Sequence, residues 1–150
     1  MKIAACQMVS GPDVAANLTE AARLIAEAAS GGARLVALPE YFCLMGQRDS
    51  DKLAIAEPPG QGPIQAMLRD AARDLGLWVV GGTLPMATPD PLHVANTTLV
   101  FSPEGAQVAS VARRWSMASS GMVSMWSRRT ASACIGSGPW RPAMNRARGS

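Results

Sequence analysis

The first forty residues follow the pattern of a strand, a helix and a second strand, and this pattern constrains the fold most. Residues 3–9 form a short apolar run. Apolar residues then recur at three- and four-residue spacing over 14–28, as on one face of a helix, and Ser30-Gly31-Gly32 ends the pattern. Residues 35–38 are a continuous apolar run, closed by Pro39-Glu40. A helix between two buried strands indicates a β-α-β unit whose strands are parallel neighbours.

The alternation of strands and helices continues as far as residue 109. The further elements that we expect are a loop over 44–63, a helix over 64–75, a strand over 77–82, a proline-rich turn over 85–91, a strand over 94–101 and a return strand starting at 107–109. The last two strands are joined by Ser102-Pro103-Glu104-Gly105, with Pro second and Gly fourth, as a type I turn prefers. The predicted fold class is α/β.

Composition changes abruptly near residue 110. All eleven acidic residues lie at or before Glu104, so residues 1–110 carry seven basic side chains and a net charge of −4. Residues 111–150 carry seven Arg, no acid and no Leu, a net charge of +7. Because so few aliphatic side chains remain there, chain entropy is not offset and disorder is expected. We predict one partial domain over 1–110 and a basic tail rich in Arg, Ser, Met and Trp over 111–150.

Several classes of protein are excluded by what the sequence lacks. No apolar run approaches the ~20 residues of a membrane helix, and Gln7 comes too early for a signal peptide. The three cysteines, Cys6, Cys43 and Cys134, have neither the even number of a disulfide framework nor the spacing of a metal site. Gly136-Ser137-Gly138 is too short for a phosphate loop. We therefore expect a cytoplasmic protein without metal or cofactor.

Glu40 is the residue best placed for chemistry. It follows directly after a buried strand, and α/β folds place functional groups at the carboxyl ends of their strands. A carboxylate set among Leu38, Pro39, Tyr41 and Phe42 is expected to lose part of its hydration, which suits it to proton transfer. The competing interpretation is an ordinary surface carboxylate at the end of a strand.

The order of motifs over roughly residues 1–109 resembles the nitrilase superfamily of carbon–nitrogen hydrolases. The matching segments are Lys2-Ile3-Ala4-Ala5-Cys6-Gln7-Met8, Ala16-Asn17-Leu18, Leu35-Val36-Ala37-Leu38-Pro39-Glu40-Tyr41-Phe42, Leu77-Trp78-Val79-Val80-Gly81-Gly82, and Asn96-Thr97-Thr98-Leu99-Val100-Phe101 with Pro103-Glu104-Gly105. Each pattern is soft, but their order and spacing together are specific. The loop after Phe42 is more similar to the amidase branch near ω-amidase and deaminated-glutathione amidase than to true nitrilases.

The resemblance implies a fold, a reaction and a role for one residue. The family fold is a four-layer α-β-β-α sandwich, of which this chain would form the front part. The family hydrolyses non-peptide C–N bonds with a cysteine nucleophile, a glutamate base and a lysine that stabilises the oxyanion. These roles are physically reasonable because a thiol needs a base and an oxyanion needs a nearby cation. By resemblance Glu40 is the general base, and the substrate is the amide of a small carboxylic acid.

The sequence departs from the family after the hairpin. The family carries a Lys-x-His stretch there and later a cysteine at the end of a strand, but no lysine follows Lys52. The segment around Cys134 does not match the family's cysteine motif, and Cys43 stands where the family has no nucleophile. His93, the single histidine, precedes the fourth strand and is interpreted as a solvated loop residue. The chain as written is therefore predicted to be inactive.

The basic tail allows a second hypothesis, a non-catalytic protein that binds nucleic acid or an anionic surface. Seven Arg with Trp115, Trp126 and Trp140 could supply phosphate contacts and base stacking. Against nucleic acid as a partner, the Arg residues are scattered and no nucleic-acid module is recognisable. Binding to generic DNA or RNA that weakens steeply with salt would favour this hypothesis over the hydrolase.

The composition break yields a prediction about the gene. If residues 111–150 arise from a change of reading frame, the DNA after codon 110 should encode a Lys-x-His stretch soon after the junction in another frame. Further on, it should encode a Cys at the end of an apolar strand. Translation of the downstream DNA in all frames is the check. If neither feature appears in any frame, the tail is a genuine extension and the binding hypothesis gains.

Overall fold

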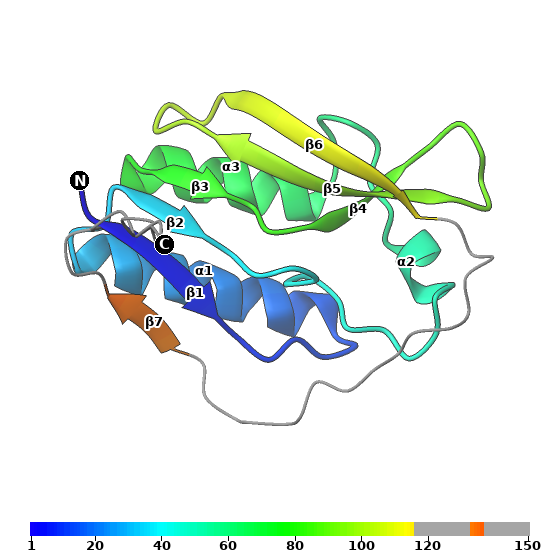
Figure 1. The fold of residues 1–150 in the computed structure, drawn as a ribbon, viewed down its shortest axis with the longest axis horizontal. Helices are drawn as coiled ribbons and strands as arrows, with labels where there is room; N and C mark the ends of the chain where they lie inside the picture. The colour runs from blue at the N-terminus through cyan, green and yellow to red at the C-terminus, as the bar shows by residue number, and fades with distance from the viewer. Residues whose placement is uncertain (116–132, 137–150) are drawn as a thin grey trace, which may run out of the picture.

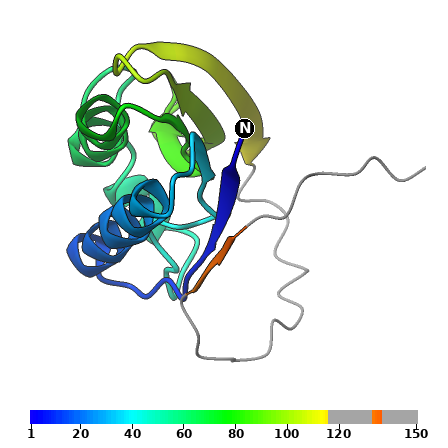
Figure 2. The same cartoon turned by 90° about the vertical axis from the view of Figure 1, so that its left-hand side faces the viewer.

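A single mixed sheet organises the protein, and two helices cover one of its faces. The computed structural model describes residues 1–115 and 133–136. The sheet has seven strands in the order β4-β5-β3-β2-β1-β7, with β6 on the other side of β5 (Figure 1). The strands are β1 (Ile3–Gln7), β2 (Leu35–Ala37), β3 (Trp78–Val80), β4 (Leu84–Ala87), β5 (Val94–Phe101), β6 (Gln107–Trp115) and β7 (Ala133–Gly136). The helices are α1 (Val14–Ser30), α2 (Asp51–Ala54) and α3 (Pro63–Leu75), and α1 and α3 lie on the same side of the sheet (Figure 2).

The predicted β-α-β unit is confirmed. Strands β1 and β2 pair in parallel with α1 as the crossover, and β2 and β3 pair in parallel with α3 as the crossover. The Asp13 side chain accepts a hydrogen bond of 3.1 Å from the amide of Ala16, which satisfies one of the free amides at the start of α1. At the other end Gly32, at φ +81°, takes the left-handed conformation that glycine adopts cheaply.

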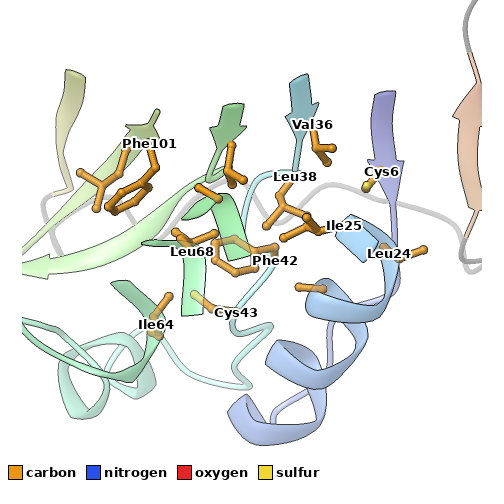
Figure 3. Close-up of a cluster of buried hydrophobic side chains, with 14 of the residues drawn as sticks. Cys6, Leu24, Ile25, Val36, Leu38, Phe42, Cys43, Ile64, Leu68 and Phe101 are labelled. Atoms are coloured by element: carbon orange, nitrogen blue, oxygen red, sulfur yellow. The ribbon is translucent and has the colours of Figure 1, made fainter. Parts of the chain in front are cut away.

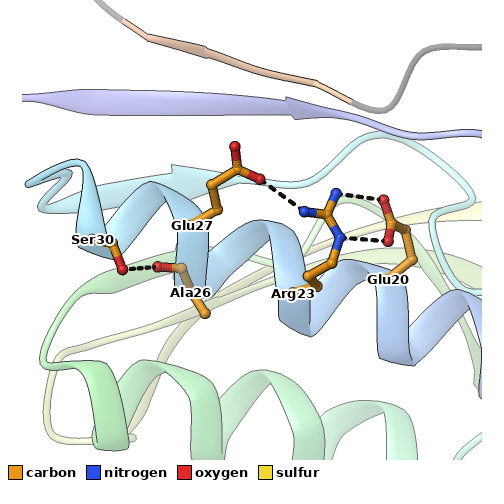
Figure 4. A network of polar contacts seen from close by, with 5 residues as sticks. All are labelled: Glu20, Arg23, Ala26, Glu27 and Ser30. Carbon is orange, nitrogen blue, oxygen red and sulfur yellow. Dashed lines mark hydrogen bonds and ion pairs between the residues drawn. The ribbon is translucent and has the colours of Figure 1, made fainter.

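The core lies between the sheet and the two helices. Leu24 and Ile25 of α1, Leu68 of α3 and Val36 of β2 are fully buried there (Figure 3). Val79 of β3 is also fully buried. The opposite surface of α1 is polar, and Arg23 forms ion pairs with Glu20 at 2.8 Å and Glu27 at 2.9 Å (Figure 4). The helix is thus held by its apolar stripe, because exposed ion pairs contribute little to stability.

Three elements differ from the prediction. Strand β4 occupies part of the expected proline-rich turn; Pro85 is tolerated because β4 pairs with β5 at the edge of the sheet. Helix α2, within the expected loop over 44–63, is too short to show an apolar period. Strand β6 continues to Trp115, so the predicted boundary at residue 110 falls inside a strand.

Two short parts of the predicted tail belong to strands. Residues 111–115 belong to β6, and β7 pairs antiparallel with β1, with Cys134 in register with Cys6. Strand pairing depends on backbone hydrogen bonds, so a segment without Leu can still join a sheet edge. The remainder of the predicted tail, including Gly138, lies outside the described residues.

The sheet face away from α1 and α3 carries rows of apolar side chains. Ile3, Leu35 and Trp78 are in register across β1, β2 and β3, and Ile3 and Trp78 are 41% and 37% exposed. On β6, Val111 is 69% exposed and pairs with Thr98 of β5. Among the described residues no helix covers this face (Figure 2). An uncovered apolar face of this kind favours association.

We expect the purified chain to associate into homo-oligomers or aggregate rather than remain monomeric. Val111→Lys should reduce association, because a charge on the open face opposes its burial. The matched control is Leu92→Lys, since Leu92 is 67% exposed but lies in the loop between β4 and β5. Light scattering after size-exclusion chromatography measures the mass. A monomeric wild-type chain with a sharp two-state melt would contradict the idea of an incomplete sandwich.

Candidate active site around Glu40

Glu40 lies three residues after β2, at the carboxyl ends of the parallel strands, as predicted. Its side-chain oxygen Oε1 accepts a hydrogen bond of 3.2 Å from Nδ2 of Asn96, which is on β5. Alternate residues of β5 face opposite sides of the sheet, and Leu99 and Phe101 face the core under the helices. Asn96 is an odd number of residues from both, so it faces the other side. The carboxylate therefore lies with Asn96 on the sheet face away from the helices.

The prediction that the Glu40 carboxylate loses part of its hydration is wrong in the part of the chain that the structure describes, because the side chain is exposed there. Leu38 and Phe42 are buried in the core, but Glu40, between them, is exposed. Residues two apart along an extended segment share a face only while the chain stays regular, and the backbone turns after Pro39. Glu40 is accordingly accessible to a partner molecule from the open side of the sheet.

The segment after Glu40 is held by side chains from three other parts of the fold. The amide of Tyr41 donates to Oγ1 of Thr83 at 3.0 Å, and Oγ of Ser10 donates to the carbonyl of Phe42 at 3.1 Å. Nδ2 of the buried Asn17 donates to the carbonyl of Cys43 at 2.9 Å. Tyr41 is also the one non-glycine residue with positive φ in the described chain, at +55°. That conformation costs about 1–2 kcal/mol, so the backbone at Tyr41 is strained and these hydrogen bonds stabilise it.

Lys52 of α2 contacts the residue next to Glu40. Its Nζ lies 4.5 Å from the ring centroid of Tyr41 and 3.5 Å from the Tyr41 hydroxyl oxygen, and it pairs with Asp49 at 3.7 Å. A cation over an aromatic ring is a favourable arrangement. Sequence reasoning did not connect Lys52 with Tyr41, because the loop over 44–63 gave no periodic signal to bring them together.

Cys6 and Cys43 are both buried, so neither thiol is exposed to a substrate or reagent. Burial raises the pKa of the Cys43 thiol to about 12, and the nearby negative charge of Glu57 acts in the same direction. Cys6 belongs to the core cluster beneath α1. Cys134 is in β7, and the residues preceding it lie outside the described part of the chain. His93 is in the loop before β5, as predicted, and its Nδ1 lies 2.6 Å from Oδ2 of Asp90.

A metal centre is not suggested by the described residues, among which no group of three His, Cys, Asp or Glu side chains could hold an ion. Nor does any helix in the described ranges have the length and apolar character needed to cross a membrane.

Comparison with known proteins identifies the family. The family model for carbon-nitrogen hydrolases matches residues 2–132, most of the chain. This chain belongs to the carbon–nitrogen hydrolase family. The match runs past residue 110, where the composition changes, and the resemblance to the nitrilase superfamily predicted from the motifs is confirmed.

Several amidases are similar to this carbon–nitrogen hydrolase chain in sequence. A chloroplastic omega-amidase from Arabidopsis thaliana is 35% identical over 106 residues, covering 69% of this chain and 28% of the relative. The human deaminated glutathione amidase is 32% identical over 111 residues, covering 72% of this chain and 34% of the relative. The chain spans about a third of the length of such curated relatives.

Solved structures of the same superfamily share the fold. The C. elegans NitFhit protein has a TM-score of 0.68 at 28% identity, over 75% of this chain and 27% of that one. An amidase from Nesterenkonia sp. has a TM-score of 0.60 at 29% identity, over 75% of this chain and 42% of that one. The nitrilase-like fold class expected for the front part of the chain is thereby confirmed.

The burial of Cys43 leads to a prediction about its reactivity. With a pKa of about 12, only about one thiol in 10⁴ is ionised at pH 8, and the thiolate is the reactive form. Iodoacetamide at pH 8 should therefore label Cys43 much more slowly in the folded chain than in the same chain in urea. Mass spectrometry of the Cys43 peptide measures both rates. Equal rates would show that the thiol is neither buried nor shifted.

The same shift gives a sign for stability against pH. An unfolded Cys43 ionises near the ordinary value of 9.0, whereas the folded one keeps its proton to about pH 12. Stability from this group is therefore complete below pH 9 and is lost as the pH rises from 9 to 12. The difference in the free energy of unfolding between the wild type and Cys43→Ala, measured by urea denaturation, should be smaller at pH 10 than at pH 8. A constant difference between the two proteins would contradict the shift.

Proposed function

We propose that this chain is the front part of an amidase that hydrolyses the C–N bond of small carboxylic acid amides, with Glu40 as general base. The observation that carries the proposal is the position of Glu40 after β2, accessible from the open sheet face and hydrogen-bonded to Asn96. A general base must be reachable by the group whose proton it takes. The omega-amidase and deaminated glutathione amidase relatives support this choice of substrate class.

In this proposal Glu40 takes the proton of a thiol that attacks the amide carbon. Asn96 Nδ2 occupies one oxygen of the carboxylate, Oε1, so the other oxygen is the one available for the proton. A neutral amide donor fixes the orientation of the carboxylate through one hydrogen bond. This arrangement suits a base that must accept a proton and return it to the leaving amine.

The proposal also includes what the chain lacks. No lysine follows Lys52 in the sequence, so the Lys-x-His stretch expected after the β5–β6 hairpin is missing. Cys43 is a poor substitute nucleophile because its raised pKa keeps it protonated. Loss of a nucleophile of this kind costs on the order of 10⁶ in rate. The chain with residues 111–150 as written should therefore be inactive.

Ammonia release from short ω-amides tests both parts of the proposal. The chain as written should release none above background. If the gene is restored to a frame that encodes the Lys-x-His stretch, the product should release ammonia, and Glu40→Gln should reduce the rate by several orders of magnitude. Glu104→Gln is the matched control, because Glu104 is a turn carboxylate bonded to Ser102 at 2.6 Å. Ammonia release by the present chain that Glu40→Gln abolishes would contradict the predicted inactivity and make Cys43 or Cys134 a candidate nucleophile. A restored enzyme insensitive to Glu40→Gln would refute the assigned base.

A further inference from the structure

The backbone on both sides of Glu40 is fixed by the end of β3 and by the segment between β3 and β4. Before Glu40, the amide of Leu38 donates to the carbonyl of Val80 at 2.9 Å. After it, the amide of Tyr41 donates to Oγ1 of Thr83 at 3.0 Å. This second bond holds the peptide unit that joins Glu40 to Tyr41. The orientation of that unit sets the direction in which the Glu40 side chain leaves the backbone.

Gly82 allows Thr83 to reach this peptide unit. Gly82 has φ +53°, and a Cβ there would clash with the carbonyl oxygen of Pro39. Only a residue without a side chain lets the two backbones approach so closely. Thr83 follows directly, so its hydroxyl comes within hydrogen-bonding distance of the segment that carries Glu40.

The same part of the fold also places the hydrogen-bond partner of Glu40. Thr83 immediately precedes β4, whose residues Leu84 and Pro85 are in register with Thr97 and Asn96 of β5. The β4–β5 pairing therefore fixes Thr83 and Asn96 relative to each other. One hydroxyl holds the backbone of Glu40, and one amide on the neighbouring strand binds its carboxylate.

We propose that Thr83 is a positioning residue for Glu40. Its hydroxyl oxygen accepts a hydrogen bond from the backbone amide of Tyr41 and so keeps the Glu40 carboxylate directed at Asn96. The role of the carboxylate as base rests on the proposed function, whereas its placement by Thr83 does not. Thr83 acts through the backbone amide of Tyr41. Tyr41 has a left-handed backbone conformation, and this hydrogen bond helps to hold it.

NMR of the Asn96 side-chain amide in the full chain tests this inference without an activity assay. The reference for a lost contact is Glu40→Ala. In Thr83→Val, which keeps the shape but loses the acceptor, we expect the Asn96 Nδ2 proton shifts to move more than half-way towards that reference. Thr83→Ser keeps the hydroxyl and should leave the shifts within about a tenth of that range. The Asn17 side-chain amide, bonded to Gly11 and Cys43, is the internal control and should stay unchanged.

Two results would overturn the inference. In the first, Thr83→Val shifts the Tyr41 backbone amide but leaves the Asn96 signals in place, so the hydroxyl has only a local partner. In the second, the Asn17 signals are lost both in Thr83→Val and in the smaller Thr83→Ala, so that Thr83 supports the whole loop rather than Glu40. Because these are measurements of geometry, they remain decisive even if the hydrolysis assay shows that Glu40 is not the base.

Discussion

Parallel pairing of β2 between β1 and β3 is the constraint on which the rest of the structure depends. Val36 and Val79 of these strands are fully buried, and α1 and α3 cover them by burying Leu24, Ile25 and Leu68. Because both connections are helical crossovers, the carboxyl ends of the strands meet at one edge. Glu40 and Thr83 follow two of these ends, so the candidate site is a product of the topology and not of a single loop.

Much of this front part could be predicted from local pattern. The helix over 14–28 has an apolar stripe and a capping Asp13, and α3 stops at Gly76, which is left-handed at φ +61°. Strand 94–101 was predicted with its observed bounds, because its apolar run is bordered by a proline-rich stretch on one side and a type I turn on the other. These are cases in which period, caps and turn residues indicate the same element.

The failures have a common physical origin, which is pairing between distant segments. Pro85 indicates a turn by local propensity, but β5 accepts it as an edge partner. The exposure of Glu40 depends on the turn after Pro39 and on the open sheet face, and neither is visible in its apolar neighbours. Similarly, nothing in the spacing of Thr83, Asn96 and Tyr41 announces that they surround Glu40. The role of Glu40 was suggested by the family pattern, whereas its contacts came only from the structure.

The β5–β6 hairpin has a consequence for how the chain folds during synthesis. Its pairing joins residues 94–101 to residues 107–115 across one short turn, so it is among the most local contacts in the sheet. Local pairings close rapidly and need few earlier contacts. Strand β6 is exposed from Gln107 to Arg113, so its pairing demands little of its side chains. A nascent chain can therefore complete this edge of the sheet whether the residues after 110 have the acidic, Leu-containing composition of residues 1–110 or the basic composition of residues 111–150. The change of composition near residue 110 falls inside this hairpin, and the hairpin accepts it because its strands are joined by backbone hydrogen bonds.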